Sequence, residues 1–176
     1  MRETSYLTEN RKVLGLLRKI KQFETFSDGD LRSFLDIGKL RHYEPGEVII
    51  REGARDCWVY FLLSGEVGVY KEGTKVKTLN CLGDLFGEMG VVDGAPRSAT
   101  IKTEADTLVL GVDGSLIDHM FKTNELTFCY TIYRLFSEVL AERLRITTEE
   151  NSRLKDELES VRQRLRKTKE EAKRSV

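Results

Sequence analysis

The residues best suited to do chemistry stand in one glycine-rich stretch, residues 83–100. It contains a carboxylate, Glu88, and an arginine followed by a serine, Arg97 and Ser98. A phosphate group is bound by backbone N–H groups, which glycine allows to approach closely, and by the planar fork of an arginine side chain. A sugar hydroxyl needs a nearby acceptor such as a carboxylate. The stretch therefore predicts a site for a ligand that carries both a phosphate and a ribose hydroxyl.

This stretch lies inside a region of short β-prone segments that runs from about Arg41 to Val112. Turn-like dipeptides that contain glycine separate the segments, which is typical of a sandwich or barrel with many short strands. The segments are residues 48–50, 58–63, 67–70, 76–79, 99–101 and 108–110. Between two of them, residues 72–74 fit the tip of a hairpin. The candidate site is therefore expected to be held between strands of a β-rich domain.

The glycine-rich stretch resembles the phosphate-binding cassette of cyclic nucleotide-binding domains, and we call residues 83–100 the cassette. The family pattern is Gly-Glu, a short spacer and Pro-Arg-(Ser/Ala)-Ala, and the chain has Gly-Glu at residues 87–88 and Pro-Arg-Ser-Ala at residues 96–99. The upstream residues 43–53 and 59–69 also resemble this family. The likeness covers the chain from about residue 26 to about residue 148.

The resemblance implies a role for each cassette residue at a matching position. Arg97 would pair with the cyclic phosphate, and Glu88 would accept a hydrogen bond from the ribose 2′-hydroxyl. The other expected contacts are backbone donors or close packing from Gly87, Met89, Gly90, Ser98 and Ala99. The Ser98 hydroxyl would also lie near the phosphate. The alternative is a domain without its ligand, in which Arg97 and Glu88 serve only an internal salt bridge.

Residues 1–40 are expected to form N-terminal helices that pack on the β-rich domain. Apolar residues recur near helical spacing over residues 13–23. Ser27 and Asp30 resemble a capping box, with Asp in place of the usual Glu, at the start of a second helix. Gly38 is expected to stop that helix.

The family likeness and these patterns together predict a mainly β fold with flanking helices. A double-stranded β-helix (jelly-roll) barrel that binds the cyclic nucleotide is expected over residues 41–115. It would be followed, within residues 116–176, by a helical segment apolar enough to pack on the barrel and by a long C-terminal coiled-coil helix that dimerises.

The C-terminal region has neither proline nor glycine from residue 116 onward, and its apolar pattern is helical. From Leu140 the pattern narrows to alternating steps of three and four, which is the seam of a coiled coil rather than the broad face of a globular helix. Heptad position a holds Leu144, Asn151, Leu158, Leu165 and Ala172, and position d holds Leu140, Thr147, Leu154, Val161 and Thr168. A lone Asn at position a favours two parallel helices.

Charges beside the seam allow a second test of the parallel dimer. Each g residue would meet the e residue five positions later in the partner, and two of three such pairs attract. The pairs are Glu150 with Lys155, Glu157 with Arg162, and the repelling Arg164 with Lys169. Exposed pairs contribute only about 0–1 kcal/mol each, so they tune the choice of partner more than stability. The alternative is a single solvated helix with a frayed end.

Residues 141–149 resemble the dimerisation helix of bacterial catabolite activator proteins. In that family two adjacent hydroxyl residues hydrogen-bond the adenine, one from each subunit, and Thr147 and Thr148 stand at the matching place. The resemblance therefore implies that both threonines contact the ligand. Those proteins continue into a helix-turn-helix DNA-binding domain, whereas this chain ends about 30 residues after Thr147 with the coiled-coil pattern. Direct transcriptional control of that kind is not expected.

Composition and spacing argue against several other classes. The chain has 29 basic and 29 acidic residues, so no global field attracts nucleic acid or an anionic membrane. Its cysteines, Cys57, Cys81 and Cys129, and its histidines, His42 and His119, show no metal-ligand spacing and no nucleophile–base pair. No metal, no catalytic residue and no enzymatic activity are expected. Neither a signal peptide nor a membrane span is visible, which indicates a cytoplasmic protein.

The sequence thus predicts a regulatory sensor of a cyclic nucleotide, with cAMP favoured and cGMP the alternative ligand. Ligand binding would be transmitted through a parallel homodimer of the C-terminal helix, or to a downstream protein that the sequence does not identify. Two other functions stay open. One is a dimeric scaffold of the same fold without a ligand, and the other is a nucleic-acid binder that uses the basic tail over residues 161–176.

Overall fold

The structure is a computed structural model, and it describes residues 2–3, 10–24, 26–116 and 126–174. The chain divides into two compact units, residues 1–136 and residues 137–176. The boundaries predicted after residues 40 and 115 both fall inside the first unit, and they stay a prediction.

The N-terminal part of the first unit contains two helices, as predicted, with a short 3₁₀ turn between them. These are α1 (Asn10–Leu17), η1 (Lys21–Phe23) and α2 (Asp28–Ile37). At the start of α2, the Asp30 N–H donates to Ser27 Oγ over 3.1 Å and the Ser27 N–H donates to the Asp30 carboxylate over 2.8 Å. The predicted capping box is therefore confirmed, and such a cap typically contributes about 1 kcal/mol. α2 ends at Gly38, also as predicted.

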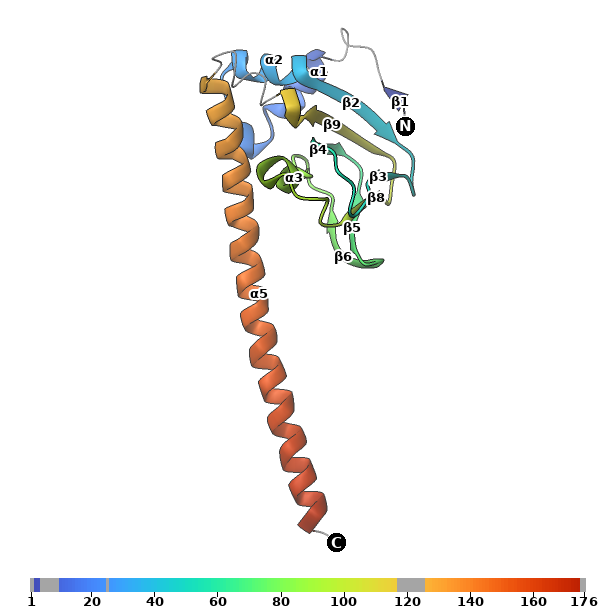
Figure 1. Cartoon of the computed structure of the whole chain (residues 1–176), viewed down its shortest axis with the longest axis vertical. Helices are drawn as coiled ribbons and strands as arrows, with labels where there is room; N and C mark the ends of the chain where they lie inside the picture. Colours follow the sequence, from blue (N-terminus) through green and yellow to red (C-terminus); the bar gives the residue numbers. More distant parts are fainter. Residues whose placement is uncertain (1, 4–9, 25, 117–125, 175–176) are drawn as a thin grey trace. The chain divides into compact units, whose positions relative to one another are not determined.

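The strands that the structure describes form two antiparallel sheets (Figure 1). They are β1 (Arg2–Glu3), β2 (Gly38–Tyr43), β3 (Val48–Ile50), β4 (Trp58–Ser64), β5 (Val67–Lys71), β6 (Thr74–Leu79), β7 (Leu85–Phe86), β8 (Thr100–Thr103) and β9 (Thr107–Asp113). One sheet has the order β1-β2-β9-β4-β7, and the other has the order β3-β8-β5-β6. The mainly β fold with flanking helices is confirmed, while closure of the sheets into a barrel stays a prediction.

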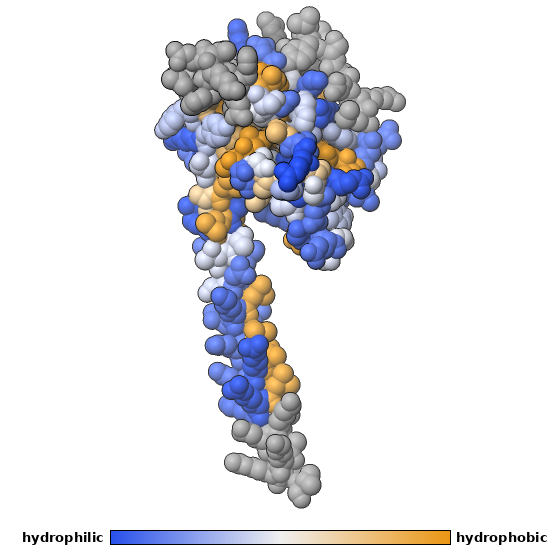
Figure 2. Space-filling view, in the orientation of Figure 1, coloured by the Kyte–Doolittle hydropathy of each residue, from blue (hydrophilic) through white to orange (hydrophobic). Residues whose placement is uncertain are grey.

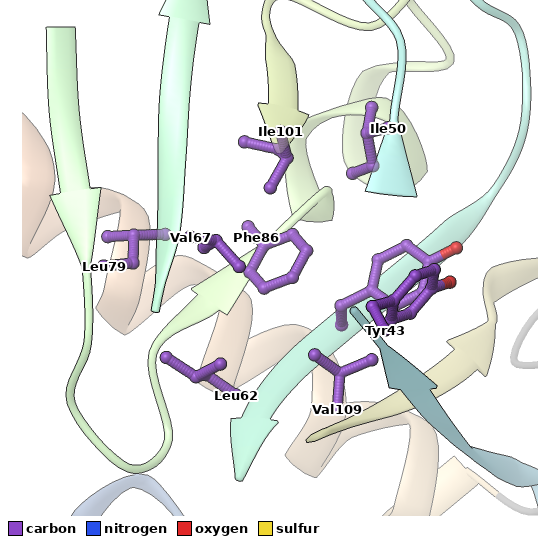
Figure 3. Packing of buried hydrophobic residues seen from close by; sticks show 9 residues of the cluster. Tyr43, Ile50, Leu62, Val67, Leu79, Phe86, Ile101 and Val109 are labelled. Atoms are coloured by element: carbon purple, nitrogen blue, oxygen red, sulfur yellow. The ribbon is translucent and has the colours of Figure 1, made fainter. Parts of the chain in front are cut away.

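Apolar side chains from both sheets fill the space between them (Figure 3). Leu62 and Val109 from the first sheet point toward Val67 and Ile101 from the second. The buried cluster comprises Tyr43, Ile50, Tyr60, Leu62, Val67, Leu79, Phe86, Ile101 and Val109. Each large apolar side chain buried in this way contributes roughly 1.5–3 kcal/mol. The cluster fixes β4 and β7, which border the loops of the candidate site.

The opposite face of β4 packs against the N-terminal helices. Side chains alternate between the two faces of a strand, so Phe61 points away from Tyr60 and Leu62. The Phe61 ring lies 5.2 Å from the ring of Phe23 and 5.1 Å from that of Phe34. β4 therefore joins the core between the sheets to the core beneath the helices.

The long C-terminal helix, α5 (Leu126–Arg174), contributes residues to both units. Within the first unit its buried side chains are Cys129, Ile132, Leu135 and Phe136, at the spacing of one helical face. In the described part of the chain, no helix has both the length and the apolar character needed to cross a membrane.

In the second unit α5 carries the predicted seam as an exposed apolar stripe (Figure 2). Five large apolar seam residues are 51–68% exposed, namely Leu144, Leu154, Leu158, Val161 and Leu165, whereas Leu140 at the start of the seam is half-buried. The side chains of the last two seam residues, Thr168 and Ala172, lie outside the described part of the structure. The helix itself is confirmed, and its pairing into a coiled coil stays a prediction.

Candidate functional site

Gly87 makes the turn from β7 into the short helix α3 (Glu88–Asp93) of the cassette. Its φ of +87° lies in the left-handed region that side chains rarely allow. A Cβ at this position would lie 2.7 Å from the Trp58 carbonyl oxygen and 3.0 Å from Arg97 Nη1. Only glycine therefore permits this turn to pass so close to the Arg97 guanidinium.

The Arg97 side chain is buried, with 3% of it exposed, and it is held by acceptors from three segments. Its Nη1 donates to the Gly87 carbonyl oxygen over 2.6 Å, and its Nη2 donates to the Trp58 carbonyl oxygen over 2.5 Å. Nε donates to Asp56 Oδ2 over 3.3 Å, and Nη2 also donates to Asp56 Oδ1. A buried guanidinium needs such partners because it has lost its hydrating water.

Asp56 is the main residue of this site that the sequence did not single out. It precedes β4 in a loop without a recognisable motif, and it also accepts from the Trp58 N–H over 3.1 Å. Partial burial alone would raise the pKa of the Asp56 carboxyl, but hydrogen bonds from Arg97 and Trp58 and the charge of Arg97 lower that pKa overall. The sequence indicates only that a buried arginine needs a carboxylate partner, and it does not indicate that this partner is Asp56.

Glu88 and Gly90 lie in α3, and both are buried. Glu88, the first residue of the helix, is 1% exposed. A Cβ added at Gly90 would lie 3.2 Å from Arg97 Nη1. Together with Gly87, this glycine keeps side chains away from the Nη1 edge of the guanidinium.

The remaining candidate site residues of the cassette, Met89, Ser98 and Ala99, lie nearer the surface. Met89 on α3 is 46% exposed, and the Ser98 hydroxyl lies 3.8 Å from its sulfur. Ala99 is half-buried and directly precedes β8. The structure therefore brings Gly87 and Gly90 to Arg97, and Met89 to Ser98.

A second residue that the sequence did not single out, Lys71, reaches the end of the cassette from the β5–β6 hairpin. Its Nζ donates to the Ser98 carbonyl oxygen over 3.0 Å and to Glu52 Oε1 over 2.5 Å. Glu52 also accepts from the Glu72 N–H over 3.0 Å, at the predicted hairpin turn. The hydrogen bond with Glu52 raises the pKa of Lys71, so its ammonium stays charged at neutral pH.

An aromatic stack positions Trp58, whose carbonyl holds Arg97. The Trp58 ring stacks on Tyr60 at 6.4 Å, and Tyr60 stacks on Phe86 at 5.3 Å. The Arg41 guanidinium lies 3.8 Å from the centre of the Trp58 ring and donates to the Tyr60 hydroxyl. Burial raises the pKa of Tyr60, so its hydroxyl is neutral. Trp58 and Tyr60 are therefore packing residues of the first unit.

Thr147 and Thr148 lie on α5 in the second unit, and both are exposed. The Thr148 hydroxyl donates to the Leu144 carbonyl oxygen over 2.7 Å. Their contact with a ligand stays a prediction.

Among the described residues, no group of three or more His, Cys, Asp or Glu side chains is arranged to hold a metal ion. His119, considered above, lies outside the described residues.

Comparison with known proteins finds similarity over a region that includes the cassette. The family model described as "Cyclic nucleotide-binding domain" matches residues 40–124. The chain is 30% identical over 112 residues to a cGMP-dependent protein kinase of Eimeria tenella, which covers 64% of this chain and 11% of the kinase. It is also 30% identical over 109 residues to a cAMP-dependent protein kinase regulatory subunit of Debaryomyces hansenii, which covers 61% of this chain and 24% of the subunit. The chain thus spans between a tenth and a quarter of the length of these curated relatives.

A solved structure shares the fold. The catabolite activator protein of Thermus thermophilus superposes with a TM-score of 0.62 at 25% identity, and the match covers 76% of this chain and 62% of that protein. The predicted resemblance to the sensor part of this family is therefore confirmed.

Replacing Asp56 by Asn tests the pairing with Arg97. Because the folded state holds the pKa of Asp56 below its unfolded value of about 3.9, the carboxylate stabilises the fold above about pH 4. This stabilisation is lost as the pH falls through the lowered pKa. We expect Asp56→Asn to unfold at a lower urea concentration than the wild type at pH 7, and the difference to shrink below about pH 4.

The matched control is Asp106→Asn, because the Asp106 side chain is 75% exposed and only its distant contact with His42 is lost. Its unfolding midpoint should stay close to that of the wild type across the same pH range. A difference between Asp56→Asn and the wild type that does not vary with pH would contradict the assigned ion pair.

Proposed function

Because residues 40–124 belong to the cyclic nucleotide-binding domain family, we propose that this chain binds a cyclic mononucleotide at the cassette and acts as a regulatory sensor without enzymatic activity. The observation that carries the proposal is the Arg97 guanidinium, buried beside two glycines at which an added Cβ would lie 3.0 Å and 3.2 Å from its Nη1. A phosphate is the ligand group that matches such a fork. Glu88 is the proposed acceptor for the ribose 2′-hydroxyl.

The hydrogen bonds of Arg97 suggest how a phosphate would be accommodated. Arginine has five N–H donors. Asp56 and Trp58 take those on the Nε and Nη2 side, while Nη1 donates to the Gly87 carbonyl. The second N–H of Nη1 would donate to a cyclic phosphate, while Asp56 and Trp58 keep the guanidinium oriented. Because the Arg97 side chain is only 3% exposed, the proposed binding step includes a local movement of the cassette around Gly87.

The preference for cAMP is supported by the state of one threonine. The Thr148 hydroxyl proton is engaged by the Leu144 carbonyl, so its oxygen remains available only as an acceptor. If Thr148 meets the base, as the family resemblance implies, this acceptor suits the 6-amino group of adenine and not the 6-oxo group of guanine. We propose cAMP as the ligand, with contacts from both Thr147 and Thr148 in the dimer. cGMP is the alternative.

The proposed dimer is a parallel coiled coil of α5. The exposed seam needs a partner to be buried, and Asn151 in the seam favours two parallel helices. Positions e hold Lys155, Arg162 and Lys169, which an antiparallel pair of identical helices would bring together. The parallel arrangement instead places two of these basic residues opposite glutamates. Ligand binding and dimerisation would then be coupled equally in both directions.

One observation favours a second function, a dimeric scaffold without a ligand. Arg97 has an internal carboxylate partner, although this is Asp56 and not Glu88, which the alternative interpretation named. Such a guanidinium is stable without any ligand.

For either function we propose that the protein lies in the cytoplasm, because Cys57 and Cys81 are exposed free thiols that suit a reducing compartment. A jelly-roll closed into a barrel is the proposed form of the domain.

Replacing Arg97 by Lys tests the phosphate site, because lysine keeps the charge and loses the fork. We expect the affinity for cAMP to fall about 10–100-fold in isothermal titration, since a hydrogen bond to a charged group contributes about 1.5–3 kcal/mol. The control is Arg55→Lys in the exposed loop before β4, which should bind like the wild type. Unchanged affinity in a folded Arg97→Lys variant would contradict the assignment, and absence of binding by the wild type would favour the scaffold.

Replacing Leu158 by Lys tests the dimer, because it places a charge at an a position that is 51% exposed in the single chain. We expect the wild type to sediment as a dimer and Leu158→Lys as a monomer at the same micromolar concentration. Glu159→Lys, at the neighbouring outer position, should remain a dimer. A monomeric wild type would contradict the proposed coiled coil.

A further inference from the structure

Lys71 connects the β5–β6 hairpin to the last residues of the cassette. Its ammonium donates to the Ser98 carbonyl oxygen over 3.0 Å. The same ammonium is held by Glu52, whose carboxylate also accepts from the Glu72 N–H at the hairpin turn. Because Glu52 fixes both the side chain of Lys71 and the turn that follows it, the ammonium has a defined position although the Lys71 side chain is 52% exposed.

The contact with Ser98 fixes more than one oxygen atom. A trans peptide is planar, and its C=O and N–H groups point in opposite directions. No cis peptide is found among the described residues, so holding the Ser98 carbonyl toward Lys71 directs the Ala99 N–H to the other side of the same plane. The backbone is anchored on either side of this peptide. Before it, the Arg97 N–H and carbonyl pair with Ala54 and Gly53, and after it, Thr100 Oγ1 accepts from the Glu52 N–H.

The Ala99 N–H has no hydrogen-bond acceptor among the residues that the structure describes. Ala99 is half-buried, so this donor can be reached by water or by a ligand. Ala99 lies only two positions after Arg97, whose guanidinium we assign to the phosphate. A ligand with a negatively charged oxygen would complete its hydrogen bonding.

We propose that Lys71 is a positioning residue for the cassette, which holds the Ser98–Ala99 peptide so that the Ala99 N–H donates to the phosphate of the bound nucleotide. This inference rests on the proposed function of the cassette. Lys71 itself acts through the peptide and does not touch the ligand.

The experiment replaces Lys71 by Met, which keeps the length of the side chain and removes the ammonium. We expect about 3–10-fold weaker binding of cAMP in isothermal titration, since one oriented donor is lost while Arg97 remains. Lys71→Arg, which can still donate to the Ser98 carbonyl, should restore most of the affinity. The matched control is Lys75→Met on the same hairpin, because Lys75 pairs with Glu104 away from the cassette, and it should bind like the wild type.

A measurement without nucleotide separates positioning from a direct contact. In the ligand-free protein, the carbonyl carbon resonance of Ser98 should move upfield in Lys71→Met and stay in place in Lys75→Met, because only the first loses a donor to that oxygen. Weaker binding without this shift would overturn the positioning role. If the wild type binds cAMP and Lys71→Met binds it with the same affinity, the positioning role is overturned as well, while the proposed function stands. A wild type that binds neither cAMP nor cGMP would contradict the proposed function, and the role of Lys71 would fall with it.

Discussion

A guanidinium buried in a protein is stable only where carboxylates and carbonyls replace the water that it has lost. Arg97 meets this requirement through Asp56, Gly87 and Trp58. These three partners come from the loop before β4, the turn after β7 and the first residue of β4. One side chain thus gathers three segments around the cassette. The same interaction explains the glycine at position 87, because a Cβ there would lie 2.7 Å from the Trp58 carbonyl oxygen and 3.0 Å from Arg97 Nη1.

The rest of the first unit keeps these segments in place. The Trp58 ring contacts both the Arg41 guanidinium and Tyr60, and Tyr60 in turn stacks on Phe86, the residue before Gly87. On the other face of β4, Phe61 is packed against the aromatic residues of the N-terminal region. Packing on both faces of β4 therefore limits the movement of the Trp58 carbonyl. A ligand that engages Arg97 would act on a rigid strand on one side and on the turn at Gly87 on the other.

The features that the sequence predicted are those encoded within a few neighbouring residues. The capping box from Ser27 to Asp30 spans four residues, the cassette is a contiguous motif, and the heptad pattern of α5 repeats along one helix. Asp56 and Lys71 could not be found in this way, because Asp56 pairs with a residue 41 positions away and Lys71 with one 27 positions away. Their roles depend on which strands become neighbours, and no local pattern encodes that. A salt bridge between Arg97 and Glu88 was only the alternative interpretation, and the carboxylate that pairs with Arg97 is instead Asp56, which is distant in sequence.

The most direct test of the central claim, that the buried Arg97 and its surrounding glycines form a working cyclic nucleotide site, is isothermal titration of the full chain with cAMP and then with cGMP. We predict saturable binding of about one nucleotide per chain for cAMP and weaker binding for cGMP, because one guanidinium per domain engages one phosphate. Tighter binding of cGMP would contradict only the preference for adenine. No heat and no thermal stabilisation with either nucleotide would contradict the claim itself.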